Sequence, residues 1–320
     1  PALLKDGFRP DDILVTTIDA DNRVDRQYFS SLTKVFLDSP DPKHTSYQPL
    51  PMYFNNIWDV PMFIRMVALG SSFWVMVEAT RPYRLRNFSA HSQSLTGLIA
   101  SDYWSVTTIV EDGHQFWRCF YRFHGNHIVV PIFVPIYQDA VLGHTFWQTI
   151  KEQYLQQRRW AWGVTDIPYA FERNLKDHSI GFIEKWMQFY RLFDGYYSWA
   201  TASVVLAFAG WPPLLINETY QHTVFAYNFP SYYSHILTIA GIGMIISLTI
   251  SSLILPPAPA RYKHHRLAKA RDWILTPILL PIASLMFGSL PAIDAQTRLM
   301  LGRYLEFRVT VKRSVDSKTA

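Results

Sequence analysis

The chain has 320 residues, of which 49% are hydrophobic and 17% charged, and its formal net charge is +5. The charged share lies below the ~25% of an average soluble domain. Most of the apolar excess follows residue 197. Residues 1–165 therefore resemble a mixed soluble domain, and the rest of the chain resembles a membrane protein. The modest, dispersed positive charge favours a membrane surface or an anionic substrate over nucleic acid, and a single cysteine, Cys119, excludes an intrachain disulfide or a multi-cysteine metal site.

The first predicted element is a buried strand at residues 11–18, which are rich in Ile, Leu, Val and Thr. Residues 22–39 then place apolar side chains at helical spacing, which gives the order strand, Asp-Ala-Asp turn, helix. A doubly wound domain needs further strands beside this one. We therefore expect the first strands of the domain to precede this chain.

Two aspartates, Asp19 and Asp21, directly follow this strand. Neighbouring carboxylates repel each other unless a cation or polar ligand compensates, and a D-x-D turn can bind a divalent cation and, through it, a diphosphate. The alternative is a solvated turn before a helix, where acids are also favoured. An EF-hand loop is excluded, because Val24 and Ser30 stand where that loop needs Gly and Glu, and the pattern of a haloacid-dehalogenase phosphatase is absent.

Residues 40–51 contain four prolines and are predicted to form a loop or an extended segment. The apolar stretch 55–79 follows. Its longest uncharged run, 66–77, is too short to cross a membrane, so we predict a packed helix of the soluble domain.

A second acidic pair, Glu111 and Asp112, lies in residues 105–123, which repeat the opening order of strand, acidic residues and amphipathic helix. An acid after a second strand can act as a general base on a sugar hydroxyl if the fold places it opposite the first pair. The alternative is an acid that is stabilised at a helix N-terminus. Residues 127–137 are predicted to form another strand, interrupted by prolines.

The third motif is Q-x-x-R-W in a helix predicted at residues 144–163. Gln156, Arg159 and Trp160 lie at positions i, i+3 and i+4, hence on one face. They offer an amide, a guanidinium for phosphate and an indole on which a sugar can stack. The alternative is a basic, aromatic helix anchored at lipid headgroups.

Residues 166–197 are predicted to form amphipathic helices that lie in the membrane interface, and residues 198–320 a transmembrane region. Two uncharged stretches, 198–217 and 233–255, are each about the ~20 residues needed to cross a bilayer. A third apolar stretch, 273–293, contains three prolines and has basic residues on both sides. It is predicted either to cross the membrane or to form a re-entrant segment.

The basic residues of the loops predict the orientation. The loop at 218–232 has no Lys or Arg, whereas the loop at 261–271 has five. The positive-inside rule then places the 261–271 loop and the domain of residues 1–165 in the cytoplasm.

The D-x-D at 19–21, the acidic pair at 111–112 and the Q-x-x-R-W at 156–160, followed by membrane spans, resemble the processive family 2 glycosyltransferases. These include cellulose, chitin and hyaluronan synthases. The resemblance covers residues 13–163 and the spans after them. It implies a cytosolic α/β catalytic domain of the GT-A, Rossmann-like type, N-terminally incomplete, which rests on interfacial helices beside an α-helical transmembrane region in the plasma or inner membrane.

The resemblance also implies roles for the acids. Asp19 and Asp21 would bind the donor diphosphate through Mg²⁺ or Mn²⁺. Asp112 would be the catalytic base that deprotonates the acceptor hydroxyl, and Glu111 would support it.

The remaining roles implied by the resemblance concern donor and acceptor binding. Gln156, Arg159 and Trp160 would line both sites. Residues 87–95 stand in place of the small-residue acceptor segment of the family, from whose Cys-Gly-Ser form they depart, and Ser92 in this segment is expected to bind donor or acceptor.

The implied activity is the inverting transfer of a sugar from a nucleotide-diphosphate sugar, expected to be UDP-linked, to a growing polysaccharide. The expected partners are this donor, a glycan or lipid acceptor and the lipid bilayer, without nucleic acid. Two alternatives stay open, namely transfer of a single sugar to a membrane lipid and a role as a non-catalytic membrane subunit.

Overall fold

A computed structural model describes residues 7–208, 222–259 and 265–313. Its strands are β1 (Leu14–Thr17), β2 (Arg23–Val24), β3 (Thr45–Met52), β4 (His91–Ser94) and β5 (Ile128–Tyr137). Its α-helices are α2 (Tyr28–Asp38), α3 (Met62–Ala79), α4 (Leu95–Ala100), α5 (Glu111–Arg122), α6 (Phe146–Ala161), α7 (Asp166–Lys176), α8 (Phe182–Phe208), α11 (Val224–Ile254), α12 (His265–Ser284) and α13 (Leu290–Met300). Short 3₁₀ turns lie at Pro10–Asp12, Pro42–His44 and Trp162–Thr165, and a π-helical turn joins α12 to α13 at Leu285–Ser289.

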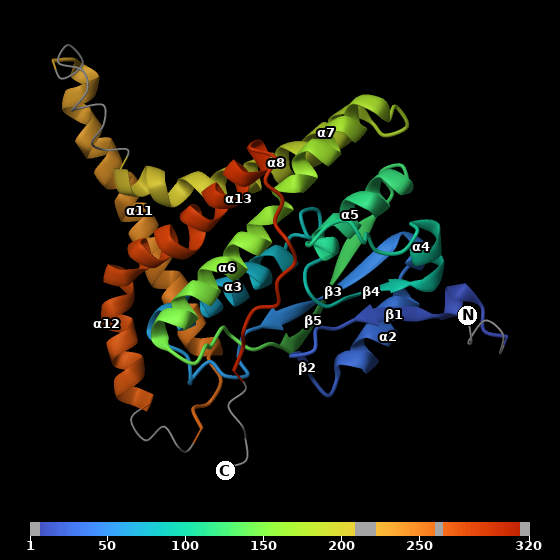
Figure 1. The fold of residues 1–320 in the computed structure, drawn as a ribbon, viewed down its shortest axis with the longest axis horizontal. Helices are drawn as coiled ribbons and strands as arrows, with labels where there is room; N and C mark the ends of the chain where they lie inside the picture. The colour runs from blue at the N-terminus through green and yellow to red at the C-terminus, as the bar shows by residue number, and fades with distance from the viewer. Residues whose placement is uncertain (1–6, 209–221, 260–264, 314–320) are drawn as a thin grey trace.

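The strands form one mixed sheet in the order β1-β4-β3-β5-β2 (Figure 1). β3 and β5 are parallel, whereas β4 runs antiparallel to both β1 and β3. β1, β3 and β5 therefore point the same way, and their carboxyl ends lie at one edge of the sheet. The predicted α/β character of the first part of the chain is confirmed at this level.

Helices cover both faces of this sheet. Alternate residues of a strand point to opposite faces, and β5 shows this clearly. Ile132 and Ile136 pack in a core with α2, whereas Val129 packs in a core with α5. The cores are built mainly from large aromatic and aliphatic residues, namely Tyr28, Leu32, Phe36 and Tyr47 on the α2 side and Phe116, Trp117, Phe120 and Tyr121 on the α5 side.

The strand predicted before the second acidic pair does not form. Residues 101–110 make turns and bends instead. The guanidinium of Arg118 donates to the carbonyl oxygens of Ser101 and Asp102, at 2.8 and 3.1 Å, and also to that of Tyr103. Asp102 and Tyr103 have φ angles of 58° and 54°, in the left-handed region, so the chain turns just before the predicted strand. The β-branched residues after them suggested a strand. There the N–H groups of Thr107 and Val110 donate instead to the hydroxyls of Ser105 and Thr108, at 3.3 and 3.4 Å, and these local bonds take the place of strand pairing.

Two further segments refine the prediction. The proline-rich stretch, predicted as loop or extended, is the central strand β3, and a register shift between Gln48 and Leu50 accommodates Pro49. The short strand β2, which pairs with the end of β5, was not predicted. The predicted strand at 127–137 and helix at 144–163 are present as β5 and α6.

Among the described residues, three helical stretches are long and apolar enough to cross a membrane, namely Met62–Ala79, Val224–Ile254 and Ala270–Met300. The second contains most of the predicted 233–255 span but starts earlier, so residues 224–232 of the predicted loop are helical. The third contains the predicted 273–293 stretch, with its prolines accommodated in the helix. The 198–217 stretch lies partly outside the described residues, and its described part continues α8 without a break.

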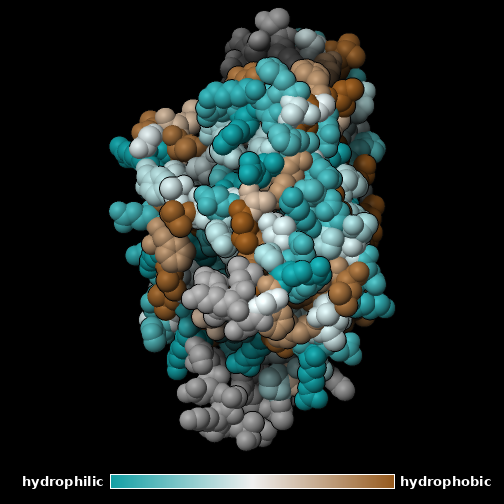
Figure 2. Space-filling view, turned by 90° about the vertical axis from the view of Figure 1, so that its right-hand side faces the viewer, coloured by the Kyte–Doolittle hydropathy of each residue, from teal (hydrophilic) through white to brown (hydrophobic). Residues whose placement is uncertain are grey.

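The first of these stretches is α3, which was predicted to be a packed helix rather than a span. It meets the length and composition required of a span, and it also packs against β3 of the sheet. Ile64 and Val75 are buried, and Arg65 pairs with Asp272 of α12 while its Nε donates to the carbonyl of Ile57 at 3.0 Å. α3 thus lies between the sheet and the apolar helices α11 and α12 (Figure 1). The opposite end of the molecule, near α4, is mainly hydrophilic with scattered hydrophobic residues (Figure 2).

His127, just before β5, is a buried histidine that affects stability. Its Nε2 lies 3.2 Å from the hydroxyl of Ser46, and its Nδ1 has no partner among the described residues. Burial lowers the pKa of His127 to about 3, and the positive charges of Arg86 and His44 act in the same direction. Between pH 6.5 and pH 3 the unfolded chain therefore binds a proton that the folded chain does not.

We predict that acidification destabilises the protein through His127. The free energy of unfolding should fall by about 1.4 kcal/mol per pH unit below pH 6.5, or about 2 kcal/mol at pH 5. Thermal unfolding in detergent at pH 7 and pH 5 measures this loss. It should shrink in His127→Gln and persist in His178→Gln, which changes an exposed histidine. An equal loss in both variants would assign the acid sensitivity to other groups.

Candidate active site

The edge of the sheet where β1, β3 and β5 end gathers the polar residues of the site. Asp19 follows β1, Tyr53 follows β3 and Gln138 follows β5, while Ser89 precedes β4, which runs the other way. Ligands of open α/β sheets bind outside the carboxyl ends of the strands. The position of these four residues is therefore that of a binding site.

Ser89 joins the two acidic motifs. Its hydroxyl donates to Oδ2 of Asp19 at 2.7 Å, and its backbone N–H donates to Oδ2 of Asp112 at 2.6 Å. The side-chain amide of Gln138 donates to the same hydroxyl. Residues that lie far apart in the sequence, Asp19 and Asp112, are thus brought to either side of one serine.

Asp112 is held by main-chain donors on both carboxylate oxygens. Oδ2 accepts from Ser89, and Oδ1 accepts from the N–H of Gly113 at 2.7 Å. It lies in the first turn of α5, where the helix dipole favours a negative charge. Its neighbour Glu111 stays exposed, although partial desolvation and the charges of Asp112 and Asp19 raise the pKa of the Glu111 carboxyl.

The two D-x-D acids have different surroundings. Asp19 is exposed, whereas the half-buried Asp21 forms an ion pair with Lys312 and accepts the N–H of Asp139 at 3.3 Å. No group of three or more His, Cys, Asp or Glu in the described part of the chain is arranged to hold a metal. Two carboxylates in one turn nevertheless fit Mg²⁺ or Mn²⁺, which take their other ligands from phosphate oxygens and water.

The phenol of Tyr53 lies within electrostatic range of these groups. Burial raises the pKa of its phenol, and the negative charges of Asp19, Asp21 and Asp112 act in the same direction, against the positive charge of Arg159. All three motifs therefore lie within electrostatic reach of one phenol, which stays protonated at neutral pH.

Helix α6 presents the residues of the Q-x-x-R-W motif in two directions. Gln156 and Trp160 line a gap of about 10 Å³ beside Tyr53, whose ring centre lies 6.0 Å from that of Trp160. Arg159 instead lines a larger cavity of about 370 Å³. The motif is thus divided between an aromatic side and a cationic side.

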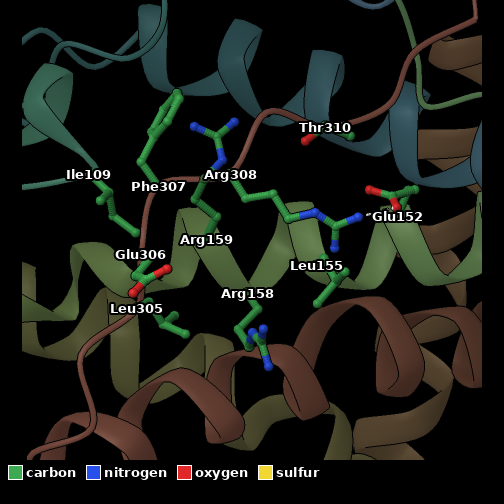
Figure 3. Close-up of a pocket in the computed structure, with 10 residues that line it drawn as sticks. All are labelled: Ile109, Glu152, Leu155, Arg158, Arg159, Leu305, Glu306, Phe307, Arg308 and Thr310. Atoms are coloured by element: carbon green, nitrogen blue, oxygen red, sulfur yellow. Dashed lines mark hydrogen bonds and ion pairs between the residues drawn. The ribbon is translucent and has the colours of Figure 1, made fainter.

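The larger cavity lies between α6 and residues 303–313, which we call the C-terminal segment (Figure 3). Arg158 and Arg159 reach it from α6, and Arg308 crosses it to bind the buried Glu152 at 2.5 Å. The guanidinium of Arg159 lies 5.7 Å from the ring centre of Phe307, and its Nε has no hydrogen-bond partner among the described residues. An anion would find arginine donors here.

The C-terminal segment crosses the whole site. The hydroxyl of Tyr304 donates to the carbonyl of Thr107 at 3.0 Å, and the buried Leu305 packs in a core with Ala161 and Ala295. At its far end the N–H of Arg313 donates to the carbonyl of Leu142 at 2.7 Å. These contacts place Lys312 against Asp21.

Ser92 lies away from these groups. It is fully buried in β4, and its hydroxyl bonds to that of Thr16 at 2.8 Å, with Tyr28 at 3.5 Å. In the same segment it is Ser89 that contacts the acids, and its role was not predicted. Tyr53 and Lys312 were also missed, because no local pattern marks them.

The chain matches no protein-family model, and no curated protein matches it significantly. A functional assignment therefore depends on the geometry of this site and on the motifs that it brings together. That geometry combines an acid held by main-chain donors, an arginine whose Nε has no hydrogen-bond partner among the described residues, and an aromatic pair.

We predict that Lys312→Gln increases the affinity for Mn²⁺. The ammonium group of Lys312 forms an ion pair with the carboxylate of Asp21, which the cation would need as a ligand. A partly exposed ion pair contributes ~1 kcal/mol, which corresponds to an about five-fold change in affinity. Titration of free Mn²⁺ by electron paramagnetic resonance, with a nucleoside diphosphate present, measures this affinity. Arg303→Gln, an exposed cation of the same segment, should leave it unchanged. An unchanged affinity in Lys312→Gln would mean that Asp21 does not bind the cation.

Proposed function

We propose that this chain carries the catalytic part of a membrane-associated, inverting glycosyltransferase that uses a nucleotide-diphosphate sugar. The observation that carries the proposal is the placement of Asp19 and Asp112 on either side of Ser89, with both acids and Arg159 within electrostatic range of Tyr53. An acid at the donor, an acid at the acceptor and a cation near the leaving diphosphate are what this transfer requires.

In the proposed reaction Asp112 accepts the proton of the acceptor hydroxyl. The acceptor oxygen forms its bond to the anomeric carbon from the face opposite the diphosphate, whose bond to that carbon breaks, so the configuration inverts. The electron pair of that bond leaves with the diphosphate, beside the guanidinium of Arg159. Asp19 and Asp21 would hold a divalent cation, which supplies Lewis-acid stabilisation of the leaving diphosphate when bound.

Aromatic residues suit the sugars. The rings of Tyr53 and Trp160 lie together at the end of β3, and an indole offers a flat apolar face to a pyranose. Gln156 lies on the same side of α6 and adds an amide for sugar hydroxyls. We assign this side to sugar binding, and the arginine-lined cavity to the charged part of the donor, for which UDP is the favoured nucleotide.

The acceptor in this proposal is a growing polysaccharide, made at the cytoplasmic face of a plasma or inner membrane. The apolar helices α11 and α12–α13 support a membrane location, and the Q-x-x-R-W motif accompanies processive synthesis in the family that the chain resembles. Transfer of one sugar to a lipid is the alternative, and product size distinguishes the two.

We predict that Asp112→Asn lowers transfer about 10²- to 10⁴-fold, the usual contribution of a general base. The isosteric amide accepts no proton, and it keeps one of the two main-chain hydrogen bonds, because its NH2 group cannot accept an N–H. A panel of radiolabelled nucleotide sugars with Mg²⁺ or Mn²⁺, in nanodiscs of the membrane-inserted protein, measures turnover. Asp38→Asn, an exposed acid at the end of α2, is the matched control.

Turnover of one donor that needs metal and collapses only in Asp112→Asn would support the proposal and identify the sugar. If no donor is turned over and no nucleotide binds with metal, the chain is a non-catalytic membrane subunit.

We predict that Arg159→Lys lowers kcat/KM for the donor about 10- to 100-fold. A lysine keeps the charge but loses the planar fork that binds phosphate through two hydrogen bonds, and hydrogen bonds to charged groups contribute about 1.5–3 kcal/mol. Arg26→Lys, at an exposed site before α2, should have no effect. Unchanged donor kinetics in Arg159→Lys would remove the guanidinium from the proposed donor site.

A further inference from the structure

Ser89 has a backbone conformation that serine seldom adopts. Its φ angle is 52°, in the left-handed region that favours glycine. Such strain persists only where the surrounding structure fixes it, and it is concentrated at functional sites. The question is what holds this residue and what the held residue does.

The two neighbours of Ser89 are fixed by one buried side chain of β3. The amide nitrogen of Gln48 donates to the carbonyl oxygens of Phe88 and Ala90, at 3.0 and 3.1 Å, and its amide oxygen accepts the N–H of Phe88 at 3.0 Å. The backbone on both sides of Ser89 is therefore tied to the centre of the sheet.

The carbonyl of Ser89 is fixed as well, by His91. The Nδ1 of His91 lies 3.0 Å from this oxygen, and its Nε2 lies 2.9 Å from the indole N–H of Trp104. An indole N–H only donates, so Nε2 accepts and Nδ1 donates to Ser89. The buried imidazole is thus held as the neutral Nδ1–H form.

The hydroxyl of Ser89 has a fixed direction. The amide of Gln138 donates to its oxygen, so the hydroxyl hydrogen is directed to the carboxylate of Asp19. The backbone N–H of the same residue is directed to Asp112. Every polar group of Ser89 therefore has an assigned partner, and both acids are bonded to this single, strained residue.

We propose that Ser89 is a positioning residue that sets the orientation of Asp19 toward the cation and its spacing from Asp112. This inference rests on the proposed function. Hydrogen-bond partners that orient ligating carboxylates typically change metal affinity or activity 10- to 100-fold. Ser89 differs from an ordinary partner of this kind because its backbone N–H also donates to Asp112, the proposed base.

The test uses Ser89→Gly and Ser89→Ala in the full membrane-inserted protein. Both lose the hydroxyl. Glycine suits the left-handed backbone, so Ser89→Gly should fold at least as stably as the wild type, whereas alanine keeps the strain. Mn²⁺ binding in the presence of a nucleoside diphosphate is read by electron paramagnetic resonance, independently of turnover. Ser30→Ala, at an exposed site in α2, is the control.

We expect both variants to bind Mn²⁺ about 10- to 100-fold more weakly than the wild type, although their melting temperatures differ. Equal Mn²⁺ affinity in Ser89→Gly and the wild type would overturn the positioning role and leave the proposed function intact. Weaker binding only in the less stable Ser89→Ala would also overturn it, because the effect would then follow stability. If the wild type binds no Mn²⁺ with nucleotide, the proposed function fails, and this inference fails with it.

Discussion

The parallel pairing of β3 with β5 decides where the functional groups of this chain lie, because β1 runs in the same direction and all three strands then end at one edge of the sheet. Asp19, Tyr53 and Gln138 arrive there from three separate parts of the sequence. An antiparallel β5 would carry Gln138 to the far edge and leave Ser89 without its donor. The site thus depends on the topology of the sheet before it depends on any side chain.

Negative charge accumulates at this edge, and the surrounding structure compensates it with few cations. Asp112 accepts two main-chain N–H bonds, and Asp19 accepts a hydroxyl that is itself hydrogen-bonded. Such donors stabilise a carboxylate without neutralising it, which leaves the acids able to attract a cation or a proton. The cations that approach, Arg159 and Lys312, come from α6 and from the C-terminal segment. The negative charges of the site therefore come from the edge of the sheet, and the positive charges come from parts of the chain that follow the sheet.

Local patterns predicted the elements whose residues carry their own periodicity, such as β5 and α6, and located the acids at strand or helix ends. They failed where a distant contact decides the conformation. Residues 105–110 are rich in β-branched side chains, yet the segment is a loop, and the carbonyl of Thr107 accepts the hydroxyl of Tyr304 from the distant C-terminal segment. The importance of Ser89 depends on Gln48 and Gln138, which only the folded sheet brings near. A serine among other small residues gives no sign of this in the sequence.

Helix α6 links the site to the apolar helices through neighbouring residues with different tasks. Arg158 binds Asp294 of α13 at 2.8 Å, whereas Arg159 lines the cavity under the C-terminal segment. This ion pair holds the turn of α6 that carries Arg159 to α13, because the loss of either partner would leave the other charge partly desolvated and unpaired. The chain leaves α13 and crosses back over the same turn to reach Asp21 through Lys312. The position of α13 therefore constrains both Arg159 and Lys312, so the apolar helices contribute to the geometry of the site.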